Sequence, residues 1–147
     1  MRKHFTSFAF SFSLIVAGLF SGSTVFAQVD AGAIQNYGTD TIFSVTVGWD
    51  VNGAAQASVA YADTLVSSGI DTVILGTFNF VSGNTYDLRA YTSAPNAGTD
   101  ADASNDTTTN GGLSVQLSGT YTIGGTSPDF ANFSAAVTAL NSFGVCG

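Results

Sequence analysis

Four oxygen-bearing side chains alternate along one polar stretch of the sequence, Asp100, Asp102, Ser104 and Asp106. Calcium takes several oxygen ligands, and alternate carboxylates on a bent loop supply them. An EF-hand loop is excluded, because Asn105 and Gly111 stand where that loop needs glycine and glutamate. The alternative, a solvated turn whose side chains bond their own backbone, is favoured because acidic surface loops are common. The three aspartates are the candidate calcium ligands, and no other cofactor is expected.

After residue 27 the sequence lacks the combinations of residues that form the common catalytic sites. That part of the sequence has no histidine and no lysine, so it cannot form Ser-His-Asp, Cys-His, histidine-zinc or Schiff-base sites. Cys146 is the only cysteine, which excludes an internal disulfide and a cysteine metal cluster. A glycosidase needs one carboxyl group of raised pKa, and nearly all the aspartates lie at turn or outward positions. The sequence therefore predicts no catalytic residues and no enzyme.

Four aromatic residues are candidates for a sugar-binding platform, Trp49, Tyr37, Tyr61 and Tyr91. Trp49 falls on the apolar side of its segment, so we expect it in the core. Tyr91 is predicted to point outward and is the aromatic residue to test for binding.

The N-terminus has the three parts of a secretory leader. Arg2, Lys3 and His4 form a basic head, FAFSFSLIVAGLF follows over residues 8–20, and Val25-Phe26-Ala27 supplies a small residue before the cut. The apolar stretch is too short to anchor the chain in a bilayer. We predict cleavage between Ala27 and Gln28 and a secreted or cell-surface product, exported through the inner membrane, that does not insert into membranes afterwards.

Charge limits the partners of that product. The whole sequence has a net charge of −7. After cleavage, Arg89 is the only basic side chain against ten aspartates, a net charge of −9 (1 minus 10). Nucleic acid is excluded as a partner, because its binding depends on Lys and Arg neutralising phosphates. Glycans and other proteins remain as partners.

Period-two alternation dominates the middle of the chain. Residues 41–52 place Phe43, Val45, Val47, Trp49 and Val51 on one face, and Asn52-Gly53 marks a hairpin. Further strands are expected over residues 56–61, 71–80, 85–92 and 113–117, with a turn at 82–84 and a surface loop over 96–112. Short strands without a long helix predict an immunoglobulin- or fibronectin-III-like antiparallel β-sandwich over residues 28–117.

The last thirty residues follow another pattern. Residues 119–123 are expected to form a short strand, and Ser127-Pro128-Asp129 to begin a helix. Apolar residues recur at helical spacing from Phe130 to Phe143, and Gly144 ends the helix. The apolar stripe needs a partner, so residues 118–147 are interpreted as the opening of a second domain, and the sequence as a fragment.

Two segments carry resemblances to known families. Residues 38–107, with TIFSVTVGWDVNG and DTVILGTFNFVSGNTYDLRAYTSAPN, resemble the cell-adhesion-related immunoglobulin-like modules called CARDB domains. GTYTIGGTSPDFANFSAAVTALNSFGVCG resembles the N-terminal cap of right-handed parallel β-helix domains, here truncated. The first resemblance implies a non-catalytic structural or adhesion module of a bacterial surface protein. The second implies the alternative, an accessory module of a carbohydrate-active, polysaccharide lyase-like enzyme whose catalytic part lies outside this sequence.

Overall fold

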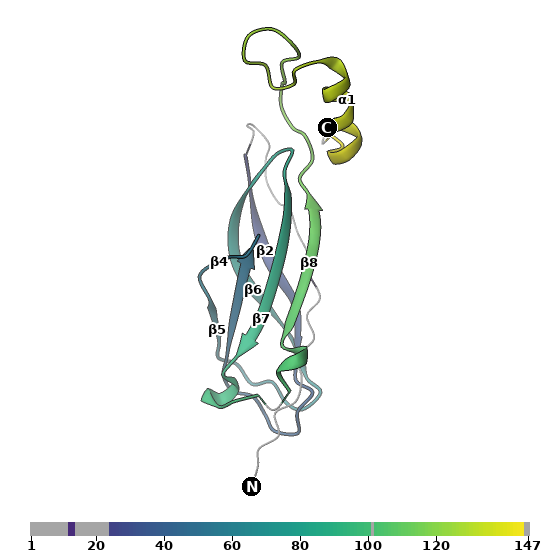
Figure 1. The fold of residues 1–147 in the computed structure, drawn as a ribbon. Coiled ribbons are helices and arrows are strands. Elements are labelled where there is room, and N and C mark those ends of the chain that lie inside the picture. Colours follow the sequence, from purple (N-terminus) through teal and green to yellow (C-terminus); the bar gives the residue numbers. More distant parts are fainter. Residues whose placement is uncertain (1–11, 14–23, 101, 146–147) are drawn as a thin grey trace.

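The protein is a sandwich of two antiparallel β-sheets in the computed structural model, which describes residues 12–13, 24–100 and 102–145, the backbone alone for 12–13 and 24–33 (Figure 1). The first sheet has the order β1 (Phe12–Ser13), β2 (Thr24–Gln35), β6 (Ile70–Val81). The second has the order β4 (Ala54–Ala55), β3 (Val45–Val51), β7 (Thr85–Ser93), β8 (Thr107–Ser114), and β5 (Val59–Tyr61) also pairs with β3. The predicted immunoglobulin-like fold is confirmed.

Strand β3 supplies the centre of the core. Val45, Val47, Trp49 and Val51 are buried as predicted, in one cluster with side chains of the first sheet such as Leu75. The Trp49 indole donates a hydrogen bond of 3.0 Å to the carbonyl of residue 57, which satisfies its polar atom inside the core.

The predicted burial of Phe43 is wrong, since 61 % of this residue is exposed. The chain bends before β3, and Ile42 forms a bridge with Leu65 and is buried in its place. The alternation of residues 45–51 therefore does not extend back to Phe43, because the backbone there is no longer a regular strand.

Two predicted turns are confirmed. Asn52 and Gly53 both have positive φ, 51° and 78°, as the two-residue turn between β3 and β4 requires. The turn at 82–84 leads from β6 in the first sheet to β7 in the second. There the Tyr86 hydroxyl accepts a hydrogen bond of 2.9 Å from the Val81 N–H, the backbone contact that a tyrosine corner predicts.

The expected loop over residues 96–112 is wrong in its second half. Short 3₁₀ turns cover Pro95–Ala97 (η1) and Ala103–Asn105 (η2), and β8 then runs along β7 from Thr107 to Ser114. The last strand thus begins before the predicted residues 113–117. The edge of β7 away from β3 can pair with a further strand, and β-branched threonines favour a strand whatever their polarity. The polar composition of residues 107–112 therefore wrongly indicated a loop.

The C-terminal segment forms α1 (Phe133–Phe143), which lies beyond the end of the sheets (Figure 1). The predicted start at Ser127 is wrong, since Asn132 caps the helix by accepting a hydrogen bond of 2.9 Å from the Ala135 N–H. Asp129 instead accepts two hydrogen bonds from Thr122. The predicted end is confirmed, because Gly144 has φ of 70° and donates to the Leu140 carbonyl.

One further expectation for this segment fails. Residues 119–123 form no strand, and only Ile123 makes a bridge, to Phe130. The apolar stripe is partly open to solvent, with 73 % of Phe133 and 45 % of Leu140 exposed and its other members half-buried. The interpretation of residues 118–147 as the opening of a second domain stays a prediction. No helix in the described part of the chain has both the length and the apolar character needed to cross a bilayer.

Candidate functional site

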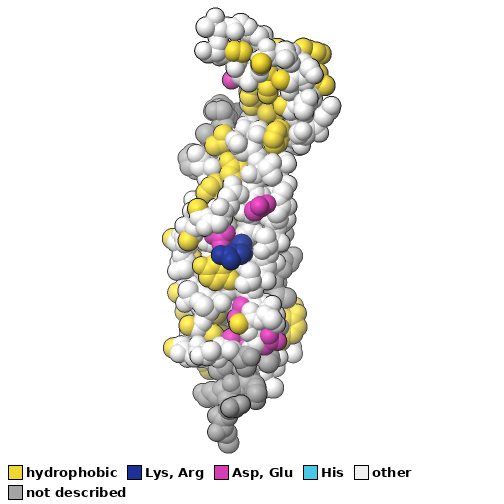
Figure 2. Space-filling model, in the orientation of Figure 1, with side chains coloured by type: hydrophobic (Ala, Val, Ile, Leu, Met, Phe, Trp, Pro, Cys, Tyr) yellow, Lys and Arg dark blue, Asp and Glu magenta, His cyan; other side chains and the backbone are white. Residues whose placement is uncertain are grey.

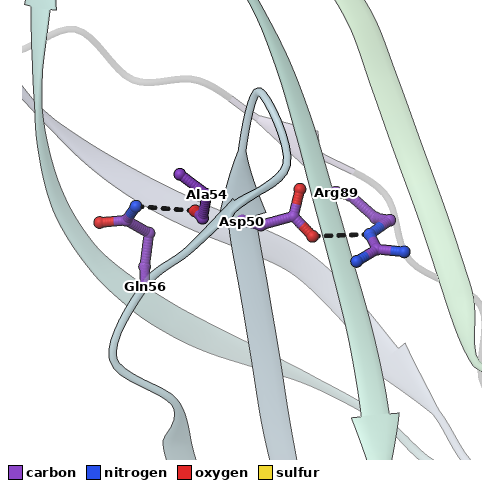
Figure 3. A network of polar contacts seen from close by, with 4 residues as sticks. All are labelled: Asp50, Ala54, Gln56 and Arg89. Carbon is purple, nitrogen blue, oxygen red and sulfur yellow. Dashed lines mark hydrogen bonds and ion pairs between the residues drawn. The ribbon is translucent and has the colours of Figure 1, made fainter.

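Direct pairing between β3 and β7 brings opposite charges together on the outer face of the second sheet. Asp50 lies opposite Arg89, and Arg89 Nε donates to Asp50 Oδ2 at 2.6 Å (Figure 3). The two side chains differ in exposure, 6 % for Asp50 and 52 % for Arg89. The enclosed Asp50 carboxylate therefore holds the Arg89 guanidinium in place through Nε. The terminal nitrogens of the guanidinium make no hydrogen bond to any other residue that the structure describes.

Tyr91 is positioned by a glycine. It lies opposite Gly48 in the same register, and a methyl group at Gly48 would overlap the Tyr91 ring. The ring therefore rests on the bare backbone of β3, which accounts for the burial of Gly48 at an outward position. Arg89 Cζ lies 5.4 Å from the ring centre, within the range of a cation–π contact.

Strand β8 completes this surface. Thr107 lies opposite Tyr91 and Thr109 opposite Arg89, and both threonines are exposed. Two rows of three residues thus cross β3, β7 and β8. The Tyr91 face is defined as these six residues, Gly48, Tyr91 and Thr107 in one row and Asp50, Arg89 and Thr109 in the other.

A shallow, open depression of about 300 Å³ lies at one end of the Tyr91 face, lined by Arg89, Tyr91, Thr92, Ala103, Asp106 and Thr107. Figure 2 shows a basic side chain (dark blue) directly above hydrophobic ones (yellow), with acidic side chains (magenta) beside it and farther down the same face. The lining thus combines an aromatic ring, hydroxyl groups, a cation and a carboxyl group.

The Asp106 carboxyl group departs from the expected solvent exposure. Asp106 is 8 % exposed, its Oδ1 accepts a hydrogen bond of 3.3 Å from the Thr92 hydroxyl, and its carbonyl accepts from the Thr92 N–H at 2.9 Å. Burial, and then the neighbouring Asp100 carboxylate, raise the pKa of Asp106 to about 6. The expectation that water keeps the aspartates at their ordinary pKa fails here, because η2 and β7 enclose this carboxyl group.

The candidate calcium ligands are not gathered into one site. Asp100 lies beside Asp106, but Asp102 turns back to accept hydrogen bonds from the Ser104 hydroxyl and N–H at 2.5 and 3.2 Å. These hydrogen bonds, the hydroxyl first, lower the pKa of Asp102. Within the described residues no three His, Cys, Asp or Glu side chains lie close enough to hold a metal ion. The arrangement fits a self-bonded turn better than a metal site, and calcium binding stays a prediction.

The other aromatic candidates lie elsewhere. Trp49 belongs to the core, and Tyr61 is buried and donates to Asp71 at 2.7 Å. Burial, and then this hydrogen bond, raise the pKa of Tyr61. Tyr37 is 47 % exposed on the segment after β2.

Sequence reasoning identified Tyr91 as an outward aromatic but missed Asp50 and Gly48. Their signal was present, because both lie at the outward positions of an alternating segment. The strand register that places them opposite Arg89 and Tyr91 had no signal in the sequence. The predicted cleavage site, Ala27 and Gln28, lies within β2, where these residues pair with Phe78 and Thr77. Cys146 lies outside the described residues.

Comparison with solved structures finds the same architecture. A crystal structure of the CARDB domain of the PF1109 protein from Pyrococcus furiosus, in complex with di-metal ions, matches 80 % of this chain and 100 % of that one, at 16 % identity and a TM-score of 0.55. The fold is that of CARDB domains. A solution NMR structure of the same domain matches 76 % of this chain and 98 % of that one, at 16 % identity and a TM-score of 0.50.

The expected CARDB-type fold is therefore confirmed, whereas the β-helix cap expected for residues 118–147 finds no support in these matches. No family model and no curated protein matches the sequence.

Proposed function

We propose that this protein is a non-catalytic module of a secreted or cell-surface bacterial protein and acts in adhesion, by binding through the outer face of its second sheet. The observation that carries this proposal is the Tyr91 face. Its ion pair and ring are held by direct cross-strand pairing, so the surface is formed before any ligand arrives. The CARDB fold supports a module of this kind.

Secretion remains compatible with the strand pairing. Cleavage after Ala27 leaves Gln28–Gln35 of β2, which pair with Ile70–Thr77 of β6. The sandwich therefore keeps the pairing of β2 with β6 in its first sheet, while β1 is removed with the predicted leader.

Bead attachment tests the proposed function. The chain is purified after its processing by the cell and is coated on beads. These beads should attach to bacterial cells more than beads coated with heat-unfolded chain. Loss of attachment after periodate treatment of the cells indicates a glycan, and loss after protease treatment indicates a protein. Equal attachment of folded and unfolded chain overturns the adhesive function.

One observation favours the alternative, an accessory module of a carbohydrate-active β-helix enzyme. The bridges Leu117–Val145 and Ile123–Phe130 are both parallel, the pairing direction of a parallel β-helix. An antibody against this chain should then detect a secreted product well above 15.0 kDa that cleaves polysaccharide. A product no larger than the chain, or a larger one without cleavage, excludes this alternative.

A further inference from the structure

The Tyr91 ring has the placement of a binding platform. The ring packs over Gly48, with Cε2, Cζ and the hydroxyl oxygen nearest to that glycine, and Tyr91 is only partly buried. A pyranose ring has an apolar side of C–H groups, which the electron-rich face of an aromatic ring attracts. A tyrosine held in this way offers one sugar unit a fixed surface at little entropic cost.

Polar groups surround the ring on the two sides that β8 and the neighbouring row provide. The guanidinium of Arg89 supplies unused N–H donors, and the hydroxyl groups of Thr107 and Thr109 both donate and accept. Asp106 lines the same depression and adds an acceptor. Sugar hydroxyl groups also donate and accept, so a mixed set of this kind complements them.

Charge decides which class of glycan fits. Asp50 already balances the charge of Arg89, the only lysine or arginine after residue 3, and the depression also contains the Asp106 carboxyl group. The whole chain is strongly acidic, with a net charge of −7. Acidic polysaccharides are therefore repelled, and a neutral one is not.

A protein partner fits the surface less well. Stable protein interfaces bury roughly 800 Å² on each side and rely on several aromatic or arginine anchors. The Tyr91 face offers one ring and one arginine among small polar side chains, around a shallow depression of about 300 Å³.

We propose, building on the adhesive function above, that the Tyr91 face binds a neutral polysaccharide. One pyranose unit stacks on Tyr91, and Arg89 and the two threonines bond its hydroxyl groups. Contact with a single unit is weak, so attachment of a cell or a matrix depends on many copies engaging one polymer.

Affinity electrophoresis tests this proposal. The acidic chain, as the cell processes it, migrates through native gels that contain dextran, laminarin, xyloglucan or galactomannan, or the acidic polymers alginate or polygalacturonate. At least one neutral polymer should retard the chain, and the acidic polymers should not. Retardation by the acidic polymers alone, or by none of the six, overturns the proposal.

Four variants locate the site. Tyr91→Ala should weaken retardation by the neutral polymer about five- to tenfold, whereas Tyr91→Phe should keep most of it. Gly48→Ala should weaken it as well, because the added methyl group displaces the ring. Phe133→Ala, which removes an exposed ring from α1 beyond the end of the sheets, is the matched control and should bind as wild type.

Further controls distinguish loss of binding at the Tyr91 face from loss of folding and from failure of the adhesive function. Buried Trp49 emission checks that each variant is folded, and Arg89→Lys provides a charge-preserving variant that should also bind less because it loses the planar fork. Beads that adhere to cells while the Tyr91, Gly48 and Arg89 variants bind normally overturn the Tyr91 site and leave the adhesive function standing. Beads that do not adhere overturn the function itself.

Discussion

At the scale of single residues, Asp50 and Arg89 have unequal surroundings. Asp50 is enclosed while half of Arg89 remains in water, so removing the arginine leaves a buried carboxylate without its cation. An exposed ion pair contributes little, but loss of one partner of a buried charge is costly.

Arg89→Ala should therefore lower the free energy of unfolding by about 1–3 kcal/mol, as partial solvent access reduces the cost of a fully buried pair. Urea denaturation followed by Trp49 fluorescence measures it. The double variant Asp50→Asn with Arg89→Ala should recover part of the loss, because no unpaired charge remains. A double variant less stable than the sum of both single changes would contradict this account.

Asp106 gives stability a dependence on pH. Its folded pKa of about 6 lies above the ordinary value of 3.8, so the folded state holds its proton more tightly than the unfolded state. This contribution is fully present below about pH 3.8 and is lost as the pH rises through about 6. Asp106→Asn should therefore remove a decrease of up to about 1–2 kcal/mol between pH 4 and 7, after allowance for solvent near the loop.

Thermal unfolding at a series of pH values tests this, with Asp63→Asn at an exposed turn as the control. The control should keep the wild-type slope. A wild-type protein that becomes more stable from pH 4 to 7, with the same slope in Asp106→Asn, would show that Asp106 does not control it.

At the scale of elements, the sequence predicted what local alternation and turn residues determine. Val45 to Val51 and the Asn52-Gly53 turn formed as predicted because one buried face and one turn type specify them. β8 was missed because its partner edge, rather than its own polarity, makes Thr107–Ser114 a strand. The helix start was missed because two residues fit the capping preference, and Asp129 bonds Thr122 instead.

The Tyr91 face was predictable only in part, because alternation gives the side of a strand on which a residue lies but not its neighbour on the next strand. The outward direction of Tyr91, and with it that of Arg89 two residues earlier, followed from alternation within one strand. The rows that join these two residues to β3 and β8 depend on strand register. The sequence of a single chain does not specify that register.

Asn96 is an element-scale contact that no local pattern indicated. Its Oδ1 accepts hydrogen bonds from the N–H groups of Phe43 and Ser44, and its Nδ2 donates to the Thr41 carbonyl at 2.9 Å. Its φ of 49° is also left-handed. The side chain thus joins η1 to the segment that enters β3.

Asn96→Gly should destabilise the protein by about 1–3 kcal/mol through the lost hydrogen bonds alone, since glycine tolerates this backbone. Asn96→Ala should cost about 1 kcal/mol more, because alanine also strains it. Chemical denaturation of both variants measures the difference. Equal stabilities of the two would contradict the left-handed backbone, and a wild-type value for glycine would contradict the hydrogen bonds.

At the scale of the whole molecule, the predicted leader and the first sheet share residues. β2 begins at Thr24, so cleavage after Ala27 removes the partners of Phe78–Val81 on β6. We expect mass spectrometry of secreted material to find Gln28 at the N-terminus, because the three leader parts precede it. Secreted chains that retain Met1 would contradict the leader.

Local stability should fall from the sandwich to the C-terminal segment. β3 and β7 are central in their sheet and carry Trp49 and Leu88 of the core, whereas in α1 only Ala136 is buried and Phe133 is exposed. Opening free energy follows local burial, so the α1 amides should exchange with deuterium much faster than those of β3 and β7. Hydrogen exchange with peptide-level mass spectrometry measures both regions in one sample.

The Leu117 side chain, only 5 % exposed, lines the same pocket as Ala136 and Leu140 of α1. Leu117→Ala should therefore speed exchange in α1 further and leave β3 unchanged. The amides of η1, held by Asn96, are the internal control and should respond to Asn96→Gly and not to Leu117→Ala. Protection of α1 equal to that of β3 would show that the helix unfolds only together with the sandwich, and that the apolar stripe contributes to one cooperative unit.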